Sequence, residues 1–242
     1  MFFIVPIPPL LPILAVYILA AVLPAVLLLR YIYRHDTVEK EPPGLLALLL
    51  AAGVLAALGS SVLEGLAQRL LNVLVSPQSP VYTLLLAFLV VAMVEEGTKF
   101  WLLRRCTWRH PAFNYRFDGI VYAVFVSLGF AAYENIQYVL SYGLSVAIPR
   151  ALLAVPGHMA FAVYMGVFYG RAKLREGCGD VRGVRRNFRL AYLWPVFLHG
   201  FYDTCAMTGT TLATVVFLVF VAVVFFSVYR ILKRESAADM PV

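Results

Sequence analysis

Charged residues are scarce in this chain of 242 residues. Only 14% are Asp, Glu, Lys or Arg, whereas 62% are hydrophobic, and the mean hydropathy is +0.84. Soluble domains contain about a quarter charged residues and about half apolar ones. The composition therefore predicts a polytopic membrane protein and leaves no room for a separate soluble domain.

Cysteine is also rare, and the few cysteines form no pattern. Cys106, Cys178 and Cys205 stand far apart, with no CxxC pair among them. Neither a disulfide framework nor a thiolate metal site is therefore indicated. The sequence contains no HExxH, which excludes the zincin type of metalloprotease helix.

Positive charge is missing before the first apolar stretch, which runs from Phe2 to Leu29. A secretory signal peptide begins with a basic region, so this stretch is expected to remain as a first membrane helix. Prolines at positions 6, 8, 9 and 12 predict that its regular part begins near Pro12.

Long apolar runs are what the chain does have, and about 20 apolar residues cross a bilayer. The predicted fold class is therefore all-α: a polytopic membrane helix bundle formed by one integral-membrane domain over residues 1–242. The last two predicted spans are joined by a very tight link near Gly209, so a single broken helix is the alternative there. The seven predicted spans are about 11–32, 44–66, 81–103, 118–140, 151–171, 190–208 and 210–231.

The net charge of +7 would suit a nucleic-acid partner if the basic residues formed one patch, but they lie in short loops. Of the 20 lysines and arginines, three lie in the first predicted loop, four in the third, seven in the fifth and three in the C-terminal tail. Only Arg69 and Arg150 lie in even-numbered loops, and Lys99 lies inside a span. Because basic loops stay on the cytoplasmic side, the pattern predicts a multi-pass cell-membrane protein with its N-terminus outside and its C-terminus in the cytoplasm. The lipid bilayer is the expected surrounding, and no nucleic-acid partner is expected.

Two adjacent carboxylates, Glu95 and Glu96, stand within the third span. An ionisable side chain at bilayer depth costs roughly 2.5–3.5 kcal/mol, which makes the pair a functional candidate. Lys99 follows four and three residues later, so it shares a helix face with both and can neutralise one of them. A purely structural ion pair is the alternative.

The fourth span carries Asp118 at its start and Glu134-Asn135 near its far end. A carboxylate such as Asp118 suits a helix N-terminus, and capping is the alternative to a functional role. Asp118 and Glu134 are sixteen residues apart and point to roughly opposite faces, so they are not expected to act as a pair. Glu134 and Asn135 are either a polar contact to a neighbouring helix or part of a site.

Histidines occur in the fifth and sixth spans. His158 follows a Pro-Gly pair, and His199 precedes Asp203 by four residues, so these two share a face. At 1.5 Å per residue, the two histidines and the glutamate pair lie roughly 12–20 Å deep and are expected to meet at one level. Either histidine alone could be a packing residue, but the combination indicates a site between spans three to six.

These motifs, in this order on four helices, resemble those of the PrsW family of intramembrane proteases, which is related to the CAAX-protease and bacteriocin-processing group. The resemblance covers about residues 85–207, and the motif-bearing core spans about 81–208. The motifs are Glu95-Glu96-x-x-Lys99, Phe117-Asp118-Gly119-x-x-Tyr122, Gly129-Phe130-Ala131-x-x-Glu134-Asn135, Pro156-Gly157-His158 and His199-x-x-x-Asp203.

The resemblance implies hydrolysis of peptide bonds within or near the membrane, and two mechanisms are open. In the first, Glu95 activates water with His158 steering it, while His199 and Asp203 polarise the scissile carbonyl. Glu96 and Lys99 then tune the charge of Glu95, and Asp118, Glu134 and Asn135 support the site. In the second, His158, His199 and Glu95 bind zinc, which activates the water. The expected cofactor is therefore either none or Zn²⁺.

The resemblance also implies a substrate that is a membrane protein or a membrane-anchored peptide, such as a single-pass anti-sigma factor. A proton-coupled transporter is the main rival, because proton relays also need intramembrane Glu, His and Asp residues. The absence of inverted repeats argues against it. A non-catalytic membrane scaffold is the second rival.

Overall fold

The computed structural model describes residues 10–242, which form helices joined by short connections. Within that range there is no β-sheet, only an isolated bridge between Tyr115 and Pro241. Pro6, Pro8 and Pro9 lie outside the described residues. The prediction of an all-α membrane helix bundle is confirmed.

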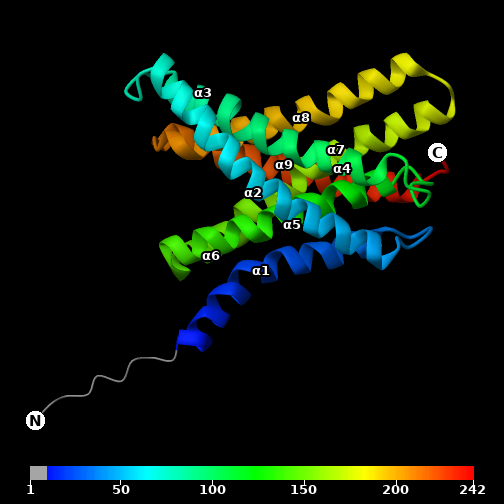
Figure 1. Cartoon of the computed structure of the whole chain (residues 1–242), viewed down its shortest axis with the longest axis horizontal. Helices are drawn as coiled ribbons and strands as arrows, with labels where there is room; N and C mark the ends of the chain where they lie inside the picture. Colours follow the sequence, from blue (N-terminus) through cyan, green and yellow to red (C-terminus); the bar gives the residue numbers. More distant parts are fainter. Residues whose placement is uncertain (1–9) are drawn as a thin grey trace, which may run out of the picture.

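Seven long helical segments make up the described chain, and two of them, residues 82–107 and 144–177, contain short or wide turns (Figure 1). The elements, with η marking 3₁₀ or π turns, are α1 (Leu10–His35), α2 (Pro43–Leu74), α3 (Tyr82–Leu85), η1 (Leu86–Ala92), α4 (Met93–Thr107), α5 (Asp118–Tyr142), η2 (Leu144–Val146), α6 (Ala147–Pro149), η3 (Arg150–Ala154), α7 (Val155–Gly177), α8 (Val181–Thr208) and α9 (Thr211–Ala237).

Five segments are long and apolar enough to cross a membrane by length and composition: residues 11–35, 43–74, 118–142, 144–177 and 211–237. The segment at 82–107 falls short because every 18-residue stretch of it contains Glu95, Glu96 and Lys99. Helix α8 begins with arginines and carries His199 and Asp203 further on. The predicted number of seven spans is therefore approximate. The two segments that are less apolar carry Glu95-Glu96-x-x-Lys99 and His199-x-x-x-Asp203.

The last two predicted spans are separate helices. Gly209 ends α8 with a positive φ of +69°, a left-handed backbone conformation that glycine adopts readily. Thr210 then begins α9, since its side chain accepts a hydrogen bond from the Ala213 N–H.

Several helices extend beyond their predicted limits. Helix α2 continues to Leu74 and α8 begins at Val181, nine residues before its predicted start. Hydropathy marks only the apolar part of a helix, and a helix can continue into water as a polar extension. For α8, that extension is strongly basic.

The connections with most of the basic residues lie at one end of the bundle. Figure 1 shows the α1–α2, α4–α5 and α7–α8 connections and the C-terminus gathered there. The Asn114 side chain donates to Glu39 at 3.0 Å, and the Arg116 N–H donates to the Met240 carbonyl at 3.0 Å. The predicted odd-numbered loops therefore share one end, which we call the basic end. That this end faces the cytoplasm stays a prediction.

Helix α5 occupies the centre and packs against α1, α2, α4 and α7. Glycines bring its backbone very close to that of α2: a Cβ atom on Gly129 would lie 2.3 Å from the Leu50 carbonyl oxygen, and one on Gly53 would lie 2.0 Å from that of Val126. Such close approach is how membrane helices gain van der Waals contact. It also brings α2 beside the polar part of α4.

Candidate active site

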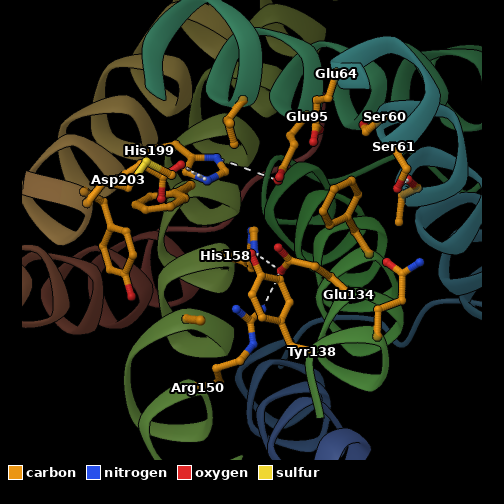
Figure 2. Close-up of a pocket in the computed structure, with 18 residues that line it drawn as sticks. Ser60, Ser61, Glu64, Glu95, Glu134, Tyr138, Arg150, His158, His199 and Asp203 are labelled. Atoms are coloured by element: carbon orange, nitrogen blue, oxygen red, sulfur yellow. Dashed lines mark hydrogen bonds and ion pairs between the residues drawn. The ribbon is translucent and has the colours of Figure 1, made fainter. Parts of the chain in front are cut away.

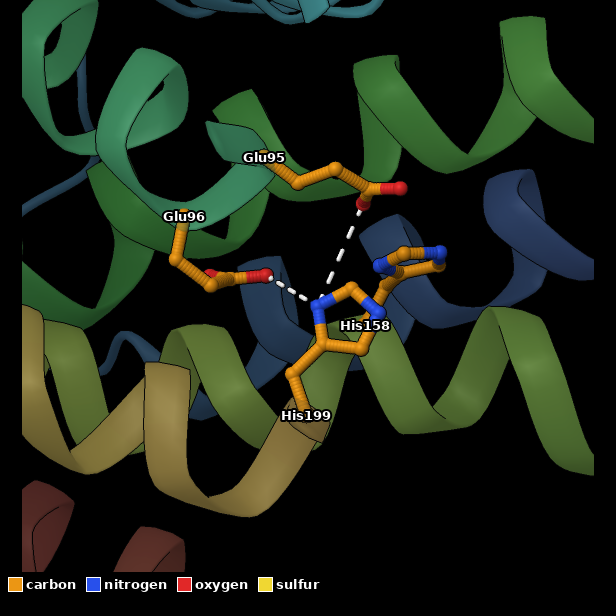
Figure 3. Close-up of side chains that lie close together, drawn as sticks. All are labelled: Glu95, Glu96, His158 and His199. Atoms are coloured by element: carbon orange, nitrogen blue, oxygen red, sulfur yellow. Dashed lines mark hydrogen bonds and ion pairs between the residues drawn. The ribbon is translucent and has the colours of Figure 1, made fainter. Parts of the chain in front are cut away.

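Glu95, Glu96, His158 and His199 meet in the interior of the bundle (Figure 3). Each offers one carboxylate oxygen or ring nitrogen, and these four atoms lie within 4.8 Å of one another. All four residues are buried, and they come from α4, α7 and α8. The structure thus brings together the glutamate pair and both histidines, although Glu95 and His199 are more than a hundred residues apart in the sequence.

Lys99 is the centre of the charge arrangement. Its ammonium donates to Glu95 Oε2 at 3.0 Å and to Glu96 Oε1 at 2.9 Å, and it lies 3.2 Å from His158 Nδ1. The two carboxylate contacts follow from the three- and four-residue spacing along α4. The lysine side chain is only 1% exposed, so its charge is balanced by the two glutamates and not by water.

The orientation of His158 follows from its two neighbours. An ammonium can only donate, so His158 Nδ1 accepts from Lys99. The ring proton is then on Nε2, which donates to Glu134 Oε2 at 3.0 Å. The His158 backbone carbonyl accepts from the Ser127 hydroxyl at 2.9 Å, which fixes this part of α7 against α5.

Glu134 is itself held by Arg150. The guanidinium donates to Glu134 Oε2 at 2.7 Å and to Asn135 Oδ1 at 2.7 Å, and it lies 3.7 Å from the centre of the Tyr138 ring. Asn135 in turn donates to the Ala21 carbonyl on α1 at 2.7 Å. A chain of contacts therefore runs from α1 through Arg150 and Glu134 to the His158 ring.

His199 is held from both sides. Its Nδ1 lies 2.9 Å from Glu96 Oε1 and its Nε2 lies 3.3 Å from Asp203 Oδ2. The Phe161 ring stacks on it with 5.0 Å between ring centres. Carboxylates at both nitrogens fix the ring plane and favour N–H groups at both positions.

A cavity of about 230 Å³ opens beside these groups (Figure 2). Glu95 lines it, whereas Glu96 and Lys99 do not and are 0% and 1% exposed. Within the glutamate pair, only Glu95 can reach a molecule in the cavity. The other charged residues and histidines that line it are Glu64, Glu134, Arg150, His158, His199 and Asp203.

Asp118 is not part of this cluster. It lies at the basic end, where its carboxylate accepts backbone N–H bonds from Asn114 at 3.0 Å and Tyr115 at 2.7 Å. Those contacts stabilise the loop before α5, as expected for an acidic residue at a helix start. Of the other predicted site residues, Lys99, Glu134 and Asp203 contact the cluster, and Asn135 is linked to it through Arg150 and Glu134.

Sequence reasoning missed two charged residues that line the cavity, Arg150 and Glu64. From the sequence, Arg150 is only a charge of an even-numbered loop. One signal for Arg150 was present: it stands at the start of an apolar run, in a chain whose even-numbered loops otherwise hold only Arg69. An isolated basic residue there needs a partner, and Glu134 is the nearby acid.

A catalytic zinc ion takes three protein ligands, such as two histidines and one glutamate. The residue types are suitable, but the lysine ammonium lies 2.9–3.2 Å from the facing atoms of Glu95, Glu96 and His158. The ammonium therefore occupies the position in which a metal cation would contact those three atoms. In addition, both nitrogens of each histidine already face charged groups. The arrangement as it stands does not fit a zinc ion.

Comparison with known proteins identifies the family. The profile of the PrsW family intramembrane metalloproteases matches residues 41–229. "Protease PrsW" of Geobacillus kaustophilus is 37% identical over 184 residues, which cover 76% of both chains. "Protease PrsW" of Oceanobacillus iheyensis is 32% identical over 219 residues, covering 90% of this chain and 94% of that protein.

"Protease PrsW" of Bacillus subtilis is 31% identical over 184 residues, covering 76% of this chain and 79% of the relative. No solved structure matches the chain. The matched range contains every residue of the cluster, from Glu95 to His199, and also Asp203. The chain is therefore a multi-pass membrane protease that belongs to the PrsW family of intramembrane metalloproteases.

Proposed function

We propose that this protease is an endopeptidase that hydrolyses peptide bonds of membrane-associated polypeptides in the cavity beside Glu95, with Glu95 as the base that activates water. The observation that carries the proposal is the difference between the paired glutamates. Glu95 lines the cavity together with both histidines, whereas Glu96 is fully buried behind it and holds His199.

The proposed reaction begins with a water molecule in the cavity. Glu95 accepts a proton from that water, and the water oxygen attacks the scissile carbonyl carbon. Lys99 is bound to both glutamates and keeps Glu95 in place. Glu95 then passes the proton to the amide nitrogen, the C–N bond breaks, and a carboxylate and an amine leave.

The histidines have different proposed roles. His199 and Asp203 both line the cavity, and the ring N–H next to Asp203 donates to the carbonyl oxygen as negative charge develops there. His158, whose two ring nitrogens contact Lys99 and Glu134, forms part of the cavity wall and confines the attacking water beside Glu95. Arg150 and Asn135 act through Glu134, so they are positioning residues.

The reaction is proposed to need no metal, because Lys99 supplies the positive charge at the centre of the donor atoms. Pure, active protein is expected to contain far less than one zinc per chain, and chelation should leave its activity unchanged. About one zinc per chain, with activity lost on chelation and restored by zinc, would refute this and would assign Glu95, His158 and His199 as ligands.

The proposed substrates are single-pass membrane proteins or membrane-anchored peptides, with anti-sigma factors as one such class. Their cleavage can be tested without knowing the sequence that is cut. Membranes containing wild-type protein or Glu95→Gln are incubated, and newly formed N-termini are labelled and identified. New termini in single-pass proteins are expected only with the wild type.

Identical termini in both samples would overturn the role of Glu95. Since Gln has nearly the same shape as Glu, the variant is expected to insert and unfold like the wild type, and thermal unfolding in detergent provides that control. Ion flux in liposomes without any cleavage would support the transporter alternative instead.

The proposed orientation places the basic end in the cytoplasm of a cell-membrane protein. Cys178 lies exposed in the α7–α8 connection and is a natural probe. In a Cys106→Ser/Cys205→Ser background, an impermeant thiol reagent should not label it in intact cells but should label it after lysis. Ready labelling in intact cells would reverse the orientation.

A further inference from the structure

The first turns of α8 carry an unusual concentration of positive charge. Arg182, Arg185, Arg186 and Arg189 are all exposed, and spacings of three and four residues put them on one side of the helix. They line a surface hollow of about 420 Å³ together with Leu190 and Leu193. None of these residues belongs to the cavity beside Glu95.

These four arginines have no carboxylate partner within residues 10–242. The nearest comparable pair, Arg175 with Asp180 at 3.8 Å, lies just before the helix. By contrast, Glu235 near the C-terminus contacts Arg116, Arg171 and Arg234. Part of the positive charge at the basic end is therefore neutralised by Glu235, whereas the four clustered arginines on α8 have no such partner.

The arrangement is unfavourable for α8 alone. Like charges three and four residues apart repel one another. The one carboxylate at this helix end, Asp180, already caps α8 by accepting the Gly183 N–H at 2.8 Å, and it forms no ion pair with the four arginines. An anion bound on this face would relieve the repulsion among them.

An apolar hollow continues directly from the basic one. It has a volume of about 350 Å³ and is lined by Leu190, Leu193, Trp194 and Phe197. Leu193, Trp194 and Phe197 are 55%, 42% and 50% exposed. Leu190 and Leu193 line both hollows, so basic and apolar surface form one stripe along α8, running from the basic end towards the middle of the helix.

We propose that this stripe is a binding site for an anionic phospholipid, with the headgroup phosphate on the arginines and an acyl chain along Leu193, Trp194 and Phe197. Basic residues next to a membrane attract anionic lipids. Tryptophan favours the interface between headgroups and chains, which agrees with Trp194 about one turn beyond Arg189. A water-soluble acidic peptide would match the arginines but leave the apolar hollow exposed.

The test uses tryptophan fluorescence of the full-length protein in vesicles. Trp194 is the tryptophan in the stripe, and a Trp101→Phe background leaves Trp108 as the other tryptophan of the chain. Brominated phosphatidylglycerol and brominated phosphatidylcholine are compared as quenchers at equal mole fractions, and the difference from a Trp101→Phe/Trp194→Phe sample isolates the Trp194 signal. Stronger quenching by phosphatidylglycerol is expected, and it should weaken in high salt.

The decisive variants remove two charges from the stripe or two from elsewhere at the same end. Arg185→Gln/Arg189→Gln should lower the relative affinity for phosphatidylglycerol about tenfold or more, since one basic residue near a membrane contributes about a fivefold change. Arg105→Gln/Arg109→Gln should leave it unchanged. Arg185→Lys/Arg189→Lys should retain most of the preference, because the positive charge is kept.

Equal quenching by the two lipids, or an unchanged preference in Arg185→Gln/Arg189→Gln, would overturn the site. An equal loss in the Arg105→Gln/Arg109→Gln control would show a general charge effect and would also overturn it. Protection of Trp194 by an acidic peptide without any lipid preference would assign the stripe to a protein partner. None of these readouts requires proteolytic activity, so the result is independent of the proposed reaction.

Discussion

Replacing Lys99 with methionine tests the charge arrangement of the active site most directly. Methionine has a similar length and removes only the ammonium. The two contacts of 3.0 and 2.9 Å to Glu95 and Glu96 are then lost. Both carboxylates are buried, with side chains 6% and 0% exposed. Removing one partner of a buried ion pair costs about 3–5 kcal/mol, because an uncompensated charge remains.

The loss should be visible as a lower melting temperature. For a chain of 150–250 residues, 1 kcal/mol corresponds to about 2–4 °C, so Lys99→Met is expected to melt about 6–20 °C below the wild type in detergent. Lys173→Met is the matched control. Lys173 pairs with Glu176 three residues later and also donates to the Trp108 carbonyl at 3.0 Å. The ion pair is partly exposed and should contribute at most about 1 kcal/mol, so the total loss should stay well below that of Lys99→Met.

A second substitution separates lost charge balance from lost packing. In Lys99→Met/Glu96→Gln, one of the two unbalanced carboxylates is removed as well, so part of the stability should return. The double variant should be about 0.5–3 kcal/mol more stable than the sum of the two single effects predicts. If Lys99→Met has the same melting temperature as the wild type, the lysine does not balance the charges of the two glutamates. The argument that Lys99 replaces a metal ion at this position would then fail as well.

Three further predictions concern other parts of the molecule. Arg150→Gln should lower turnover about 10–100-fold on any substrate found by N-terminal labelling, because Glu134 loses the guanidinium that holds it against His158. Arg69→Gln, at an exposed position, should leave turnover unchanged, and equal activity of both variants would remove Arg150 from the site. Gly129→Ala should lower the free energy of unfolding by about 1–3 kcal/mol, because its Cβ would meet the Leu50 carbonyl. Gly59→Ala, with open space around it, should be neutral or stabilising, and similar melting temperatures of the two variants would refute the close α2–α5 contact. Burial raises the pKa of Asp36, in the α1–α2 connection, from 3.8 to about 6. Ionising this carboxyl is therefore less favourable in the folded state, and the free energy of unfolding falls as pH rises from about 4 to about 6. Asp36→Asn should therefore stabilise the protein by about 1–3 kcal/mol at pH 8 and have little effect at pH 4, and an equal effect at both pH values would contradict this.

Local spacing in the sequence was enough to predict the contacts within single helices. Glu95 and Lys99, like His199 and Asp203, are four residues apart, and the atoms of each pair lie 3.0 and 3.3 Å from one another. The expected depth of the histidines and glutamates in the bilayer also agrees with their meeting in the bundle. Such predictions depend only on helix geometry, which the apolar runs specify well.

Contacts between helices were not predictable in the same way. Arg150 reaches Glu134 only because the chain reverses after α5 at Gly143, whose φ is +82°, and then passes through η2 and α6. The hydrogen bond of 2.7 Å between the Ser60 and Thr98 hydroxyls likewise depends on which face of α2 meets α4. Helices of this length can pack in many orders, and a single sequence contains no direct signal for the order chosen.

The two wide turns, η1 and η3, have a consequence for how relatives of this chain can differ in length. Each is a π-helical turn, η1 ending three residues before Glu95 and η3 four residues before His158. A π turn holds one residue more than the α-helical turn it replaces. Losing that residue would rotate the preceding half of the helix by about 100° and leave the half with the glutamates or the histidine in place. Single-residue insertions and deletions among relatives are therefore expected to fall within 86–92 and 150–154, never between Glu95 and Lys99.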